Sequence, residues 1–247
     1  ACMTVSILTL FPEMFQGPFD YSIVKRAKDQ EKIAIHIINI RDFSTDKYKS
    51  VDDHPYGGGL GMVLKVDIID KALSNVKCQM SNVKCKERVI LLDPRGTTFT
   101  QKKAREFSKL DHLILICGHY EGVDARVRTL ADESISIGDY VLTGGELPAM
   151  VITDTIARLL PGVLKKEASK NESFSPSHTL EYPQYTRPEE YKGMHVPEIL
   201  LSGNHQKIED WKKNNTTAQK DCASHRKNPV QEIPKMSGKR RGTVKLS

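Results

Sequence analysis

The chain has 247 residues, 38% hydrophobic and 28% charged, which fits a globular protein of one or two domains and argues against a disordered chain; its apolar runs are far shorter than the roughly 20 residues of a membrane helix. Five scattered cysteines without a CxxC pair or Cys/His cluster disfavour a disulfide framework and a structural zinc site, and with no recognisable secretory signal they predict a cytoplasmic protein. The net charge of +6 is unevenly distributed: residues 1–162 carry 21 basic and 21 acidic residues, whereas residues 220–247 carry 8 basic and 2 acidic ones. This distribution suggests a neutral part that binds a small ligand and a basic end that either contacts a polyanion or only aids solubility.

Alternating strands and helices dominate the first two thirds of the chain. Apolar runs rich in β-branched residues predict strands, and helical spacing predicts the segments between them, with Thr100 as a helix N-cap. This alternation is typical of an α/β fold with a parallel sheet. The predicted strands are residues 5–11, 33–40, 88–92 and 113–117, and the predicted helices are residues 12–29, 66–76, 100–110 and 146–160.

The remainder of the chain is different in character. Residues 165–177 are polar and irregular, which predicts a linker, and residues 196–201 and 208–213 have the spacing of helices in a small second domain. The pentapeptide SNVKC at residues 74–78 recurs at 81–85, just before a predicted strand. We interpret the repeat as a duplicated surface insertion, because no His or third Cys lies nearby to make a metal site.

Three glycine-containing segments could hold a ligand. VDDHPYGGGLGM (51–62) matches neither GxGxxG nor a P-loop and by itself predicts a flexible turn. CGHYEGVDAR (117–126) follows a strand, where ligands bind in open parallel sheets, and it brings glycines and the Glu121 carboxylate to that edge. SIGDYVLTGGELPAM (136–150) is irregular yet apolar enough to be buried, so its backbone polar groups need a partner such as adenine. Together the three segments predict a nucleotide-like ligand.

These segments occur in a specific order. TLFPEMF (9–15), RDF (41–43), the three segments above, PGVL (161–164), YTRPEEYKGMHVPEILLSGNH (185–205) and Trp211 together resemble the bacterial tRNA (guanine-N1-)-methyltransferase (TrmD) family of the SPOUT class. The resemblance covers residues 3 to about 213 and weakens beyond them.

The resemblance implies a fold and an activity. The fold is a parallel-sheet α/β SPOUT domain with a deep C-terminal trefoil knot (3–162), an interdomain linker that acts as a lid (163–178), and a small, mostly helical, basic tRNA-binding domain (179–247). The activity is methyl transfer from S-adenosylmethionine to N1 of guanine 37, next to the tRNA anticodon, by a homodimer without a membrane partner. Donor contacts carried over from the family are Leu92, Pro94, Gly118, Tyr120, Ile137, Gly138, Asp139, Tyr140, Val141, Leu142, Gly144, Gly145 and Pro148.

Methylation at guanine N1 needs a base, because this nitrogen carries a proton in the neutral nucleobase. The resemblance implies a linker carboxylate as that base and an arginine, here Arg158, to stabilise negative charge on the neighbouring carbonyl oxygen. The family has Asp before Ser-Phe, whereas this chain has Glu172 in a linker one residue shorter, so Glu172 is the candidate base. Glu121 is expected to position the nucleobase. Magnesium is associated with the family, and only Glu121 and Glu172 stand out as ligands.

Other readings remain open from the sequence. A SPOUT methyltransferase could act on another RNA, and the altered linker and tail fit an RNA-binding protein that has lost catalysis. A dinucleotide-dependent oxidoreductase is disfavoured because GxGxxG is missing.

Overall fold

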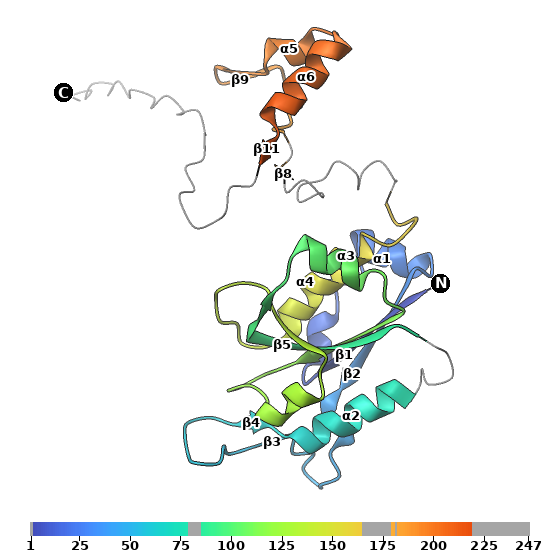
Figure 1. Ribbon diagram of the computed structural model, residues 1–247, viewed down its shortest axis with the longest axis vertical. Helices are drawn as coiled ribbons and strands as arrows, with labels where there is room; N and C mark the ends of the chain where they lie inside the picture. Colours follow the sequence, from blue (N-terminus) through green and yellow to red (C-terminus); the bar gives the residue numbers. More distant parts are fainter. Residues whose placement is uncertain (1, 79–84, 165–178, 181, 219–247) are drawn as a thin grey trace, which may run out of the picture. The chain divides into compact units, whose positions relative to one another are not determined.

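The computed structural model describes residues 2–78, 85–164, 179–180 and 182–218. The chain divides into two compact units, Ala1–Ser175 and Pro176–Ser247, and each is described by itself. The first unit is a layered α/β structure (Figure 1).

A five-stranded parallel sheet forms the centre of the first unit, which confirms the predicted α/β class with a parallel sheet. Every pair of neighbouring strands is parallel. The pairing of β5 (Glu87–Thr98) with β7 (Glu133–Ser136) shifts register between Leu92 and Thr97, where β5 passes the proline at position 94. In spatial order the strands are β2 (Ile33–Asn39), β1 (Met3–Thr9), β6 (His112–Cys117), β5 (Glu87–Thr98) and β7 (Glu133–Ser136).

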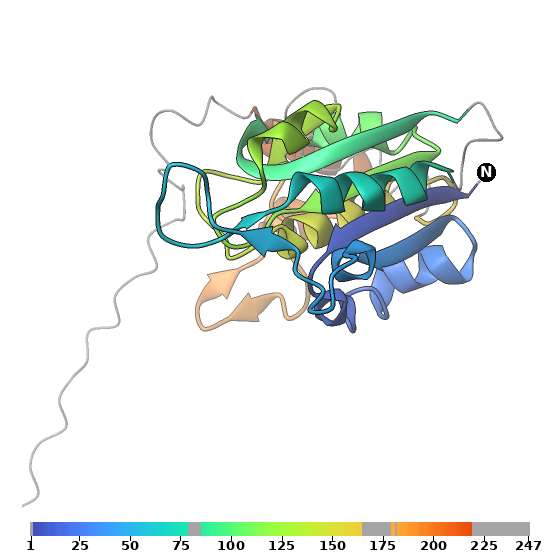
Figure 2. The same cartoon turned by 90° about the horizontal axis from the view of Figure 1, so that it is seen from below.

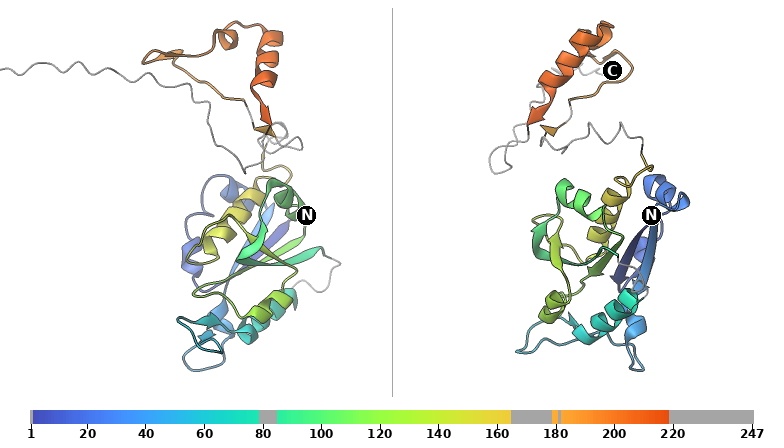
Figure 3. Two further views of the ribbon diagram at one scale, coloured as in Figure 1. Left: turned by 60° about the vertical axis from the view of Figure 1, so that its left-hand side comes forward. Right: turned by 45° about the vertical axis from the view of Figure 1, so that its right-hand side comes forward.

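Helices cover both faces of this sheet (Figures 1 and 3). On one face lie α1 (Ser22–Asp29), α3 (Gln101–Phe107), α4 (Glu146–Ala157) and the 3-10 helix η1 (Pro12–Phe15). On the other face lie α2 (Val66–Cys78) and the 3-10 helices η2 (Ile40–Phe43) and η3 (Ala125–Thr129), as Figure 2 shows for α2. The short strands β3 (Asp52–Asp53) and β4 (Val63–Leu64) pair as a hairpin at the ends of the 54–62 loop.

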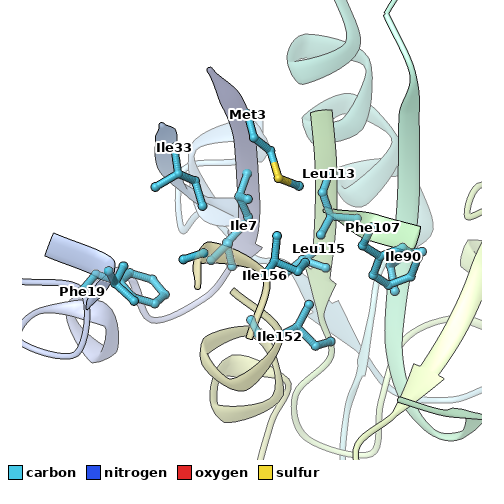
Figure 4. Close-up of a cluster of buried hydrophobic side chains, with 14 of the residues drawn as sticks. Met3, Ile7, Phe19, Ile33, Ile90, Phe107, Leu113, Leu115, Ile152 and Ile156 are labelled. Carbon is cyan, nitrogen blue, oxygen red and sulfur yellow. The ribbon is translucent and has the colours of Figure 1, made fainter. Parts of the chain in front are cut away.

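Two apolar cores result from the alternation of side chains along the central strands. Ile7 and Leu115 pack on the α4 side with Ile152 and Ile156 (Figure 4), whereas Leu8 and Ile116 pack on the α2 side. Because both faces are covered, β6 is buried at all six positions, and after His112 its sequence is a continuous apolar run instead of an alternating pattern. Burial of each such side chain contributes about 1.5–3 kcal/mol.

Some local predictions were confirmed and others were wrong. α2 and α3 lie where the spacing placed them, and the Thr100 side chain accepts a hydrogen bond from the Lys103 amide as the expected N-cap. The single helix predicted over residues 12–29 is instead η1 and α1, because Gly17 has a positive φ of 93° and turns the chain before a proline. β7, with the polar sequence ESIS, was not predicted.

Two predicted features lie outside the described residues. One is the linker at residues 165–177, and the other is most of the second SNVKC copy, residues 81–84.

The second unit is built around two helices. The predicted helices at 196–201 and 208–213 correspond to α5 (Glu198–Leu201) and α6 (His205–Asn215), and the Asn204 side chain caps α6 by accepting from the Lys207 amide at 3.2 Å. Trp211 on α6 packs edge-on against Tyr182 and Tyr185. Two short antiparallel pairs complete the described part: β8 (Thr179–Leu180) with β11 (Thr217–Ala218), and β9 (Glu190–Tyr191) with β10 (Met194–His195). Throughout the described ranges, no helix combines the length and apolar character that crossing a membrane requires.

Candidate functional site

A cavity of about 420 Å³ lies where β6 and β7 end and where β5 shifts register, at the edge of the sheet where ligands bind in open α/β folds. Its volume is within the usual range for a small-molecule site. Three segments line it: the turn inside β5, the loop after β6, and the loop between β7 and α4. The lining residues are Leu92, Asp93, Pro94, Arg95, Gly118, His119, Tyr120, Glu121, Gly122, Val123, Ile135, Ser136, Ile137, Gly138, Tyr140, Val141, Leu142, Thr143, Gly144, Gly145 and Pro148.

Two glycines let the loop before α4 cross closely over the end of β6. The Gly145 amide donates a hydrogen bond to the Gly118 carbonyl at 2.8 Å, and Gly144 forms an isolated bridge with His119. A Cβ on Gly145 would lie 2.6 Å from the Cys117 Cα, and one on Gly144 would meet the side chains of both Glu146 and His119. No larger residue fits at either position without displacing the wall of the cavity.

A buried carboxylate lies beneath this crossing. Glu146, in the first turn of α4, is 1% exposed, and its Oε1 accepts a hydrogen bond from the Thr9 hydroxyl at 2.7 Å. The same hydroxyl accepts from the Phe11 amide at 2.9 Å, so Thr9 joins β1 to α4. Glu146 Oε2 and His119 Nδ1 have no hydrogen-bond partner among the residues that the structure describes, and they lie 3.8 Å apart. A helix N-terminus favours negative charge, which offsets part of the cost of burying this group.

Cys117 shares this environment at the end of β6. Burial, followed by the nearby Glu146 carboxylate, raises the pKa of the Cys117 thiol well above 9.0. The thiol is therefore neutral and acts as a small apolar group in the wall rather than as a nucleophile.

An arginine pair marks the rim of the cavity. Asp93 is 8% exposed, and its carboxylate accepts hydrogen bonds from Arg95 at 3.2 Å (Nε and Nη2) and from Arg128 Nη2 at 2.8 Å. Burial raises the pKa of Asp93, but the hydrogen bonds from the two guanidinium groups outweigh it and hold the pKa at about 2. Asp93 is consequently ionised at neutral pH, and the three side chains carry a net charge of +1.

Glu121 stands at the junction of two glycine-containing loops. Its amide donates to the Met62 carbonyl at 3.2 Å, and its side chain lies so close to Gly61 that a Cβ there would be 2.5 Å from the Glu121 Cγ. Leu64 also bridges to Val123. The end of the 51–62 segment, at Gly61 and Met62, therefore lies beside Glu121 in the cavity wall, whereas Tyr56 and Leu60 in the middle of this segment are exposed.

The structure brings most of the predicted site residues together. All predicted donor contacts except Asp139 line the cavity, and so does Glu121. Arg158 does not: it is the C-cap of α4, whereas the cavity lies at the N-terminus of that helix, twelve residues and about 18 Å away. Glu172 lies outside the described residues.

Sequence reasoning missed several residues of the site. Asp93, Arg95 and Arg128 were not singled out, although the DPRG sequence carries a charged pair in a turn. The sequence pattern marks Glu146 only as the first residue of a predicted helix. The burial of a carboxylate in an apolar helix is the signal that could have drawn attention to it. Within the described ranges, no group of three or more His, Cys, Asp or Glu side chains could hold a metal ion.

Comparison with known proteins gives a consistent result. The family model described as tRNA (Guanine-1)-methyltransferase TrmD matches residues 3–229. Proteins named tRNA (guanine-N(1)-)-methyltransferase are similar to this chain: that of Carboxydothermus hydrogenoformans is 56% identical over 85% of this chain and 81% of its own length, and that of Dictyoglomus turgidum is 54% identical over 85% and 84%.

A solved structure agrees with these relatives. The crystal structure of the tRNA (m1G37) methyltransferase from Aquifex aeolicus superposes with a TM-score of 0.71 at 41% identity, covering 86% of this chain and 88% of that one. The chain therefore belongs to the tRNA (guanine-1)-methyltransferase (TrmD) family, with its SPOUT-class α/β fold.

Proposed function

We propose that this protein transfers a methyl group from S-adenosylmethionine to N1 of the guanine at tRNA position 37, the activity named in its Aquifex relative. One observation carries the proposal: three separate segments within residues 92–148 line a single cavity at the carboxyl ends of the parallel strands β6 and β7, in a chain of this family.

The cavity fits the methyl donor. Gly144 and Gly145 leave no Cβ between the backbone and a ligand, so peptide N–H and C=O groups can pair with the edge of an adenine. Tyr140 and Val141 are 55% and 86% exposed on the same loop, and they provide apolar surface that a nucleoside would cover. When bound, S-adenosylmethionine supplies an electrophilic methyl group on positively charged sulfur.

The reaction at guanine requires proton removal. We assign Glu172 as the base that accepts the N1 proton, on the evidence of sequence alone, because this residue lies outside the described structure. The freed N1 electron pair then forms the new bond to carbon as the carbon–sulfur bond breaks. Arg158 would stabilise the negative charge that develops on the guanine carbonyl oxygen, and Glu121 would position the nucleobase at the cavity mouth.

A second copy of the chain would complete this site. Arg158 lies about 18 Å along α4 from the cavity of its own chain, too far to contact a nucleobase bound there. The surface of α4 exposes Leu147 and Val151, 48% and 45% accessible, and a hollow of about 310 Å³ next to Val151 is lined by Phe19 and Met150, among others. We propose that this face pairs with a second copy, whose Arg158 and Glu172 act at the cavity.

The rest of the family architecture is proposed on the same basis. The close crossing at Gly145 and Gly118 supports a trefoil knot within a first domain of residues 3–162. Residues 163–178 would serve as a lid, and residues 179–247 as the tRNA-binding domain. The Trp211, Tyr182 and Tyr185 cluster of the second unit, with Lys212 5.5 Å from the Tyr182 ring, gives that domain an aromatic and basic surface. The reaction would take place in the cytoplasm.

A methyl-transfer assay on a tRNA transcript tests the proposal. We expect labelled methyl groups to be incorporated at guanine 37, and no incorporation when that guanine is replaced by adenine. Mass spectrometry that located the methyl group elsewhere would favour a different RNA target. A protein that binds S-adenosylmethionine without any transfer would contradict the proposal.

The base assignment needs its own variant. Glu172→Gln should lower kcat by roughly 100-fold or more while donor affinity stays near wild type, since a general base contributes about 10²–10⁴-fold. Glu167→Gln, on the same linker, is the matched control and should retain the wild-type rate. Equal rates for the two variants would show that Glu172 is not the base.

A further inference from the structure

The strongest feature outside the expected machinery is the pair of arginines on Asp93. Arg95 lies in the turn within β5 and lines the cavity, whereas Arg128 lies in η3 and does not. They come from segments 33 positions apart in the sequence, yet both donate to the Asp93 Oδ2 atom, at 3.2 and 2.8 Å. A single carboxylate therefore holds two guanidinium groups side by side at the cavity mouth.

The pair retains unused hydrogen-bond donors and positive charge. Arg95 directs Nε and Nη2 at Asp93, and Arg128 directs only Nη2, so each guanidinium keeps N–H groups without a partner among the described residues. The side chains are 73% and 41% exposed. Because Asp93 itself is buried and can offset only one of the two charges, the surface that solvent meets here is cationic.

A nearby arginine on the same 3-10 helix η3 differs from Arg95 and Arg128, because it has an acidic partner of its own. Arg126 binds Asp124 in a bidentate arrangement, with Nε–Oδ1 and Nη2–Oδ2 distances of 2.9 and 2.7 Å, and its side chain is 69% exposed. One guanidinium faces one carboxylate, so this pair is neutral, and neither residue lines the cavity. Arg126 is therefore a matched control for an exposed arginine with an acidic partner.

We propose that Arg95 and Arg128 form a site for a backbone phosphate of the substrate RNA, next to the nucleotide whose base enters the cavity. The inference rests on the proposed function and extends it to residues that recognise the RNA backbone. Two adjacent guanidinium groups match the several oxygens of a phosphate, with charge-assisted hydrogen bonds. A nucleobase at the mouth of the cavity brings its own flanking phosphates to the rim, where Arg95 and Arg128 meet.

The carboxylate of the methyl donor is the competing anion. Arg95 reaches the cavity, but Arg128 does not line it, so an anion that touches both arginines lies at the rim rather than inside. This placement favours the phosphate, and the test below separates the two anions.

The experiment measures binding without turnover. Arg95→Gln, Arg128→Gln, the double variant and the control Arg126→Gln are compared with wild type in the full-length protein. Fluorescence anisotropy gives the Kd for the tRNA transcript at several salt concentrations, and calorimetry gives the Kd for S-adenosylmethionine and for its decarboxylated analogue.

If the proposal holds, each of Arg95→Gln and Arg128→Gln weakens tRNA binding by roughly tenfold and lowers the slope of log K against log salt by about 0.7–0.9, the value for one phosphate contact. Arg126→Gln leaves both quantities unchanged. Donor affinity stays at the wild-type value in every variant.

Two results would overturn the proposal. One is tRNA binding by the Arg95 and Arg128 variants that equals that of Arg126→Gln. The other is weaker binding of S-adenosylmethionine, but not of its decarboxylated analogue, with tRNA affinity unchanged, which would assign the arginines to the donor carboxylate. A wild-type protein that binds tRNA but transfers no methyl group would contradict the proposed function. The phosphate site would still be tested separately, by the Kd values for tRNA.

The glutamine substitutions remove hydrogen-bond partners from buried Asp93, and the variants that carry them could fail to fold. A second set of variants keeps the proposal testable in that case. Arg95→Lys and Arg128→Lys keep the charge but lose the planar fork. We expect them to keep the wild-type salt slope and to bind tRNA several-fold more weakly than wild type. Wild-type affinity in both lysine variants would contradict a phosphate site built on guanidinium geometry.

Discussion

The Gly145→Ala substitution tests whether the close crossing of two loops builds the cavity. The added Cβ would lie 2.6 Å from the Cys117 Cα, whereas ordinary contacts begin at 3.4 Å, so the loop must retreat by about 0.8 Å. A retreat of that size stretches the 2.8 Å hydrogen bond from the Gly145 amide to the Gly118 carbonyl to about 3.6 Å, beyond a useful length.

The energetic cost follows from these two changes. Overpacking costs about 1–3 kcal/mol, and loss of the hydrogen bond about 1 kcal/mol. The backbone of Gly145, with φ −81° and ψ −4°, is accessible to alanine, which returns about 0.4–1 kcal/mol through the unfolded state. We therefore expect the free energy of unfolding to fall by about 1–3.5 kcal/mol, with a Tm lower by roughly 2–4 °C per kcal/mol.

Urea unfolding and calorimetry with S-adenosylmethionine measure the two consequences. Because the displaced loop carries much of the cavity wall, donor affinity should fall at least tenfold. Gly118→Ala is the stability control, since its Cβ would meet only ordinary contacts of 3.6 and 3.7 Å, and its free energy of unfolding should stay within about 0.5 kcal/mol of wild type. A Gly145→Ala protein with wild-type stability and donor affinity would refute the claim that this crossing shapes the site.

Three further predictions concern buried groups around the cavity. Thr9→Val should lower the free energy of unfolding by about 2–4 kcal/mol, because valine leaves the buried Glu146 carboxylate without its hydrogen bond. Thr9→Ser, which keeps the hydroxyl, should retain most of the wild-type stability. Equal stabilities of the two variants in urea unfolding would contradict the role of the Thr9–Glu146 hydrogen bond. At neutral pH the Asp93→Asn variant should have a free energy of unfolding about 2 kcal/mol lower than that of wild type, because folding lowers the Asp93 pKa from 3.8 to about 2. The stability advantage of wild type is full above pH 3.8 and should shrink as the pH falls toward 2. If unfolding measured across this pH range gave a constant difference between the two proteins, the ion pairs of Asp93 would not be its cause. Burial and, to a smaller extent, the Glu146 carboxylate raise the pKa of the Cys117 thiol. In the native protein, iodoacetamide at pH 8 should therefore alkylate exposed Cys2 at least 100-fold faster than buried Cys117, which mass spectrometry can measure. Similar rates for the two cysteines would show that the end of β6 opens to solvent.

Local sequence patterns determined the elements of this protein. Runs of β-branched and aliphatic residues predicted both β2 and β6. The run in β6 is continuous from Leu113 to Cys117 because this central strand is covered on both faces, whereas the edge strand β2 is half-buried and exposes His36. The Thr100 cap marked the start of α3. The glycine-containing loops after β6 and β7 were recognised as ligand-binding segments, since their backbone cannot form regular structure, and their ordered motifs indicated the family.

Tertiary structure decided which of these segments meet. The polar strand β7 has little local signal, and it forms because β5 offers it an open edge, with which it pairs on both sides of the register shift between Leu92 and Thr97. Nothing local indicates that Thr9 would bind Glu146 across 137 positions of sequence, because both residue types are usually exposed to solvent.

The same holds for charge. Asp93, Arg95 and Arg128 are ordinary surface residue types, and only the packing of η3 against the turn in β5 turns them into one cationic site at the cavity mouth. Arg158 carried a sequence-based prediction, but the length of α4 decided that it lies away from the cavity of its own chain. Sequence periodicity reflects interactions between residues a few positions apart, which determine secondary structure. Ion pairs and hydrogen bonds join side chains that are close in space but distant in the sequence, so the fold decides which residues pair.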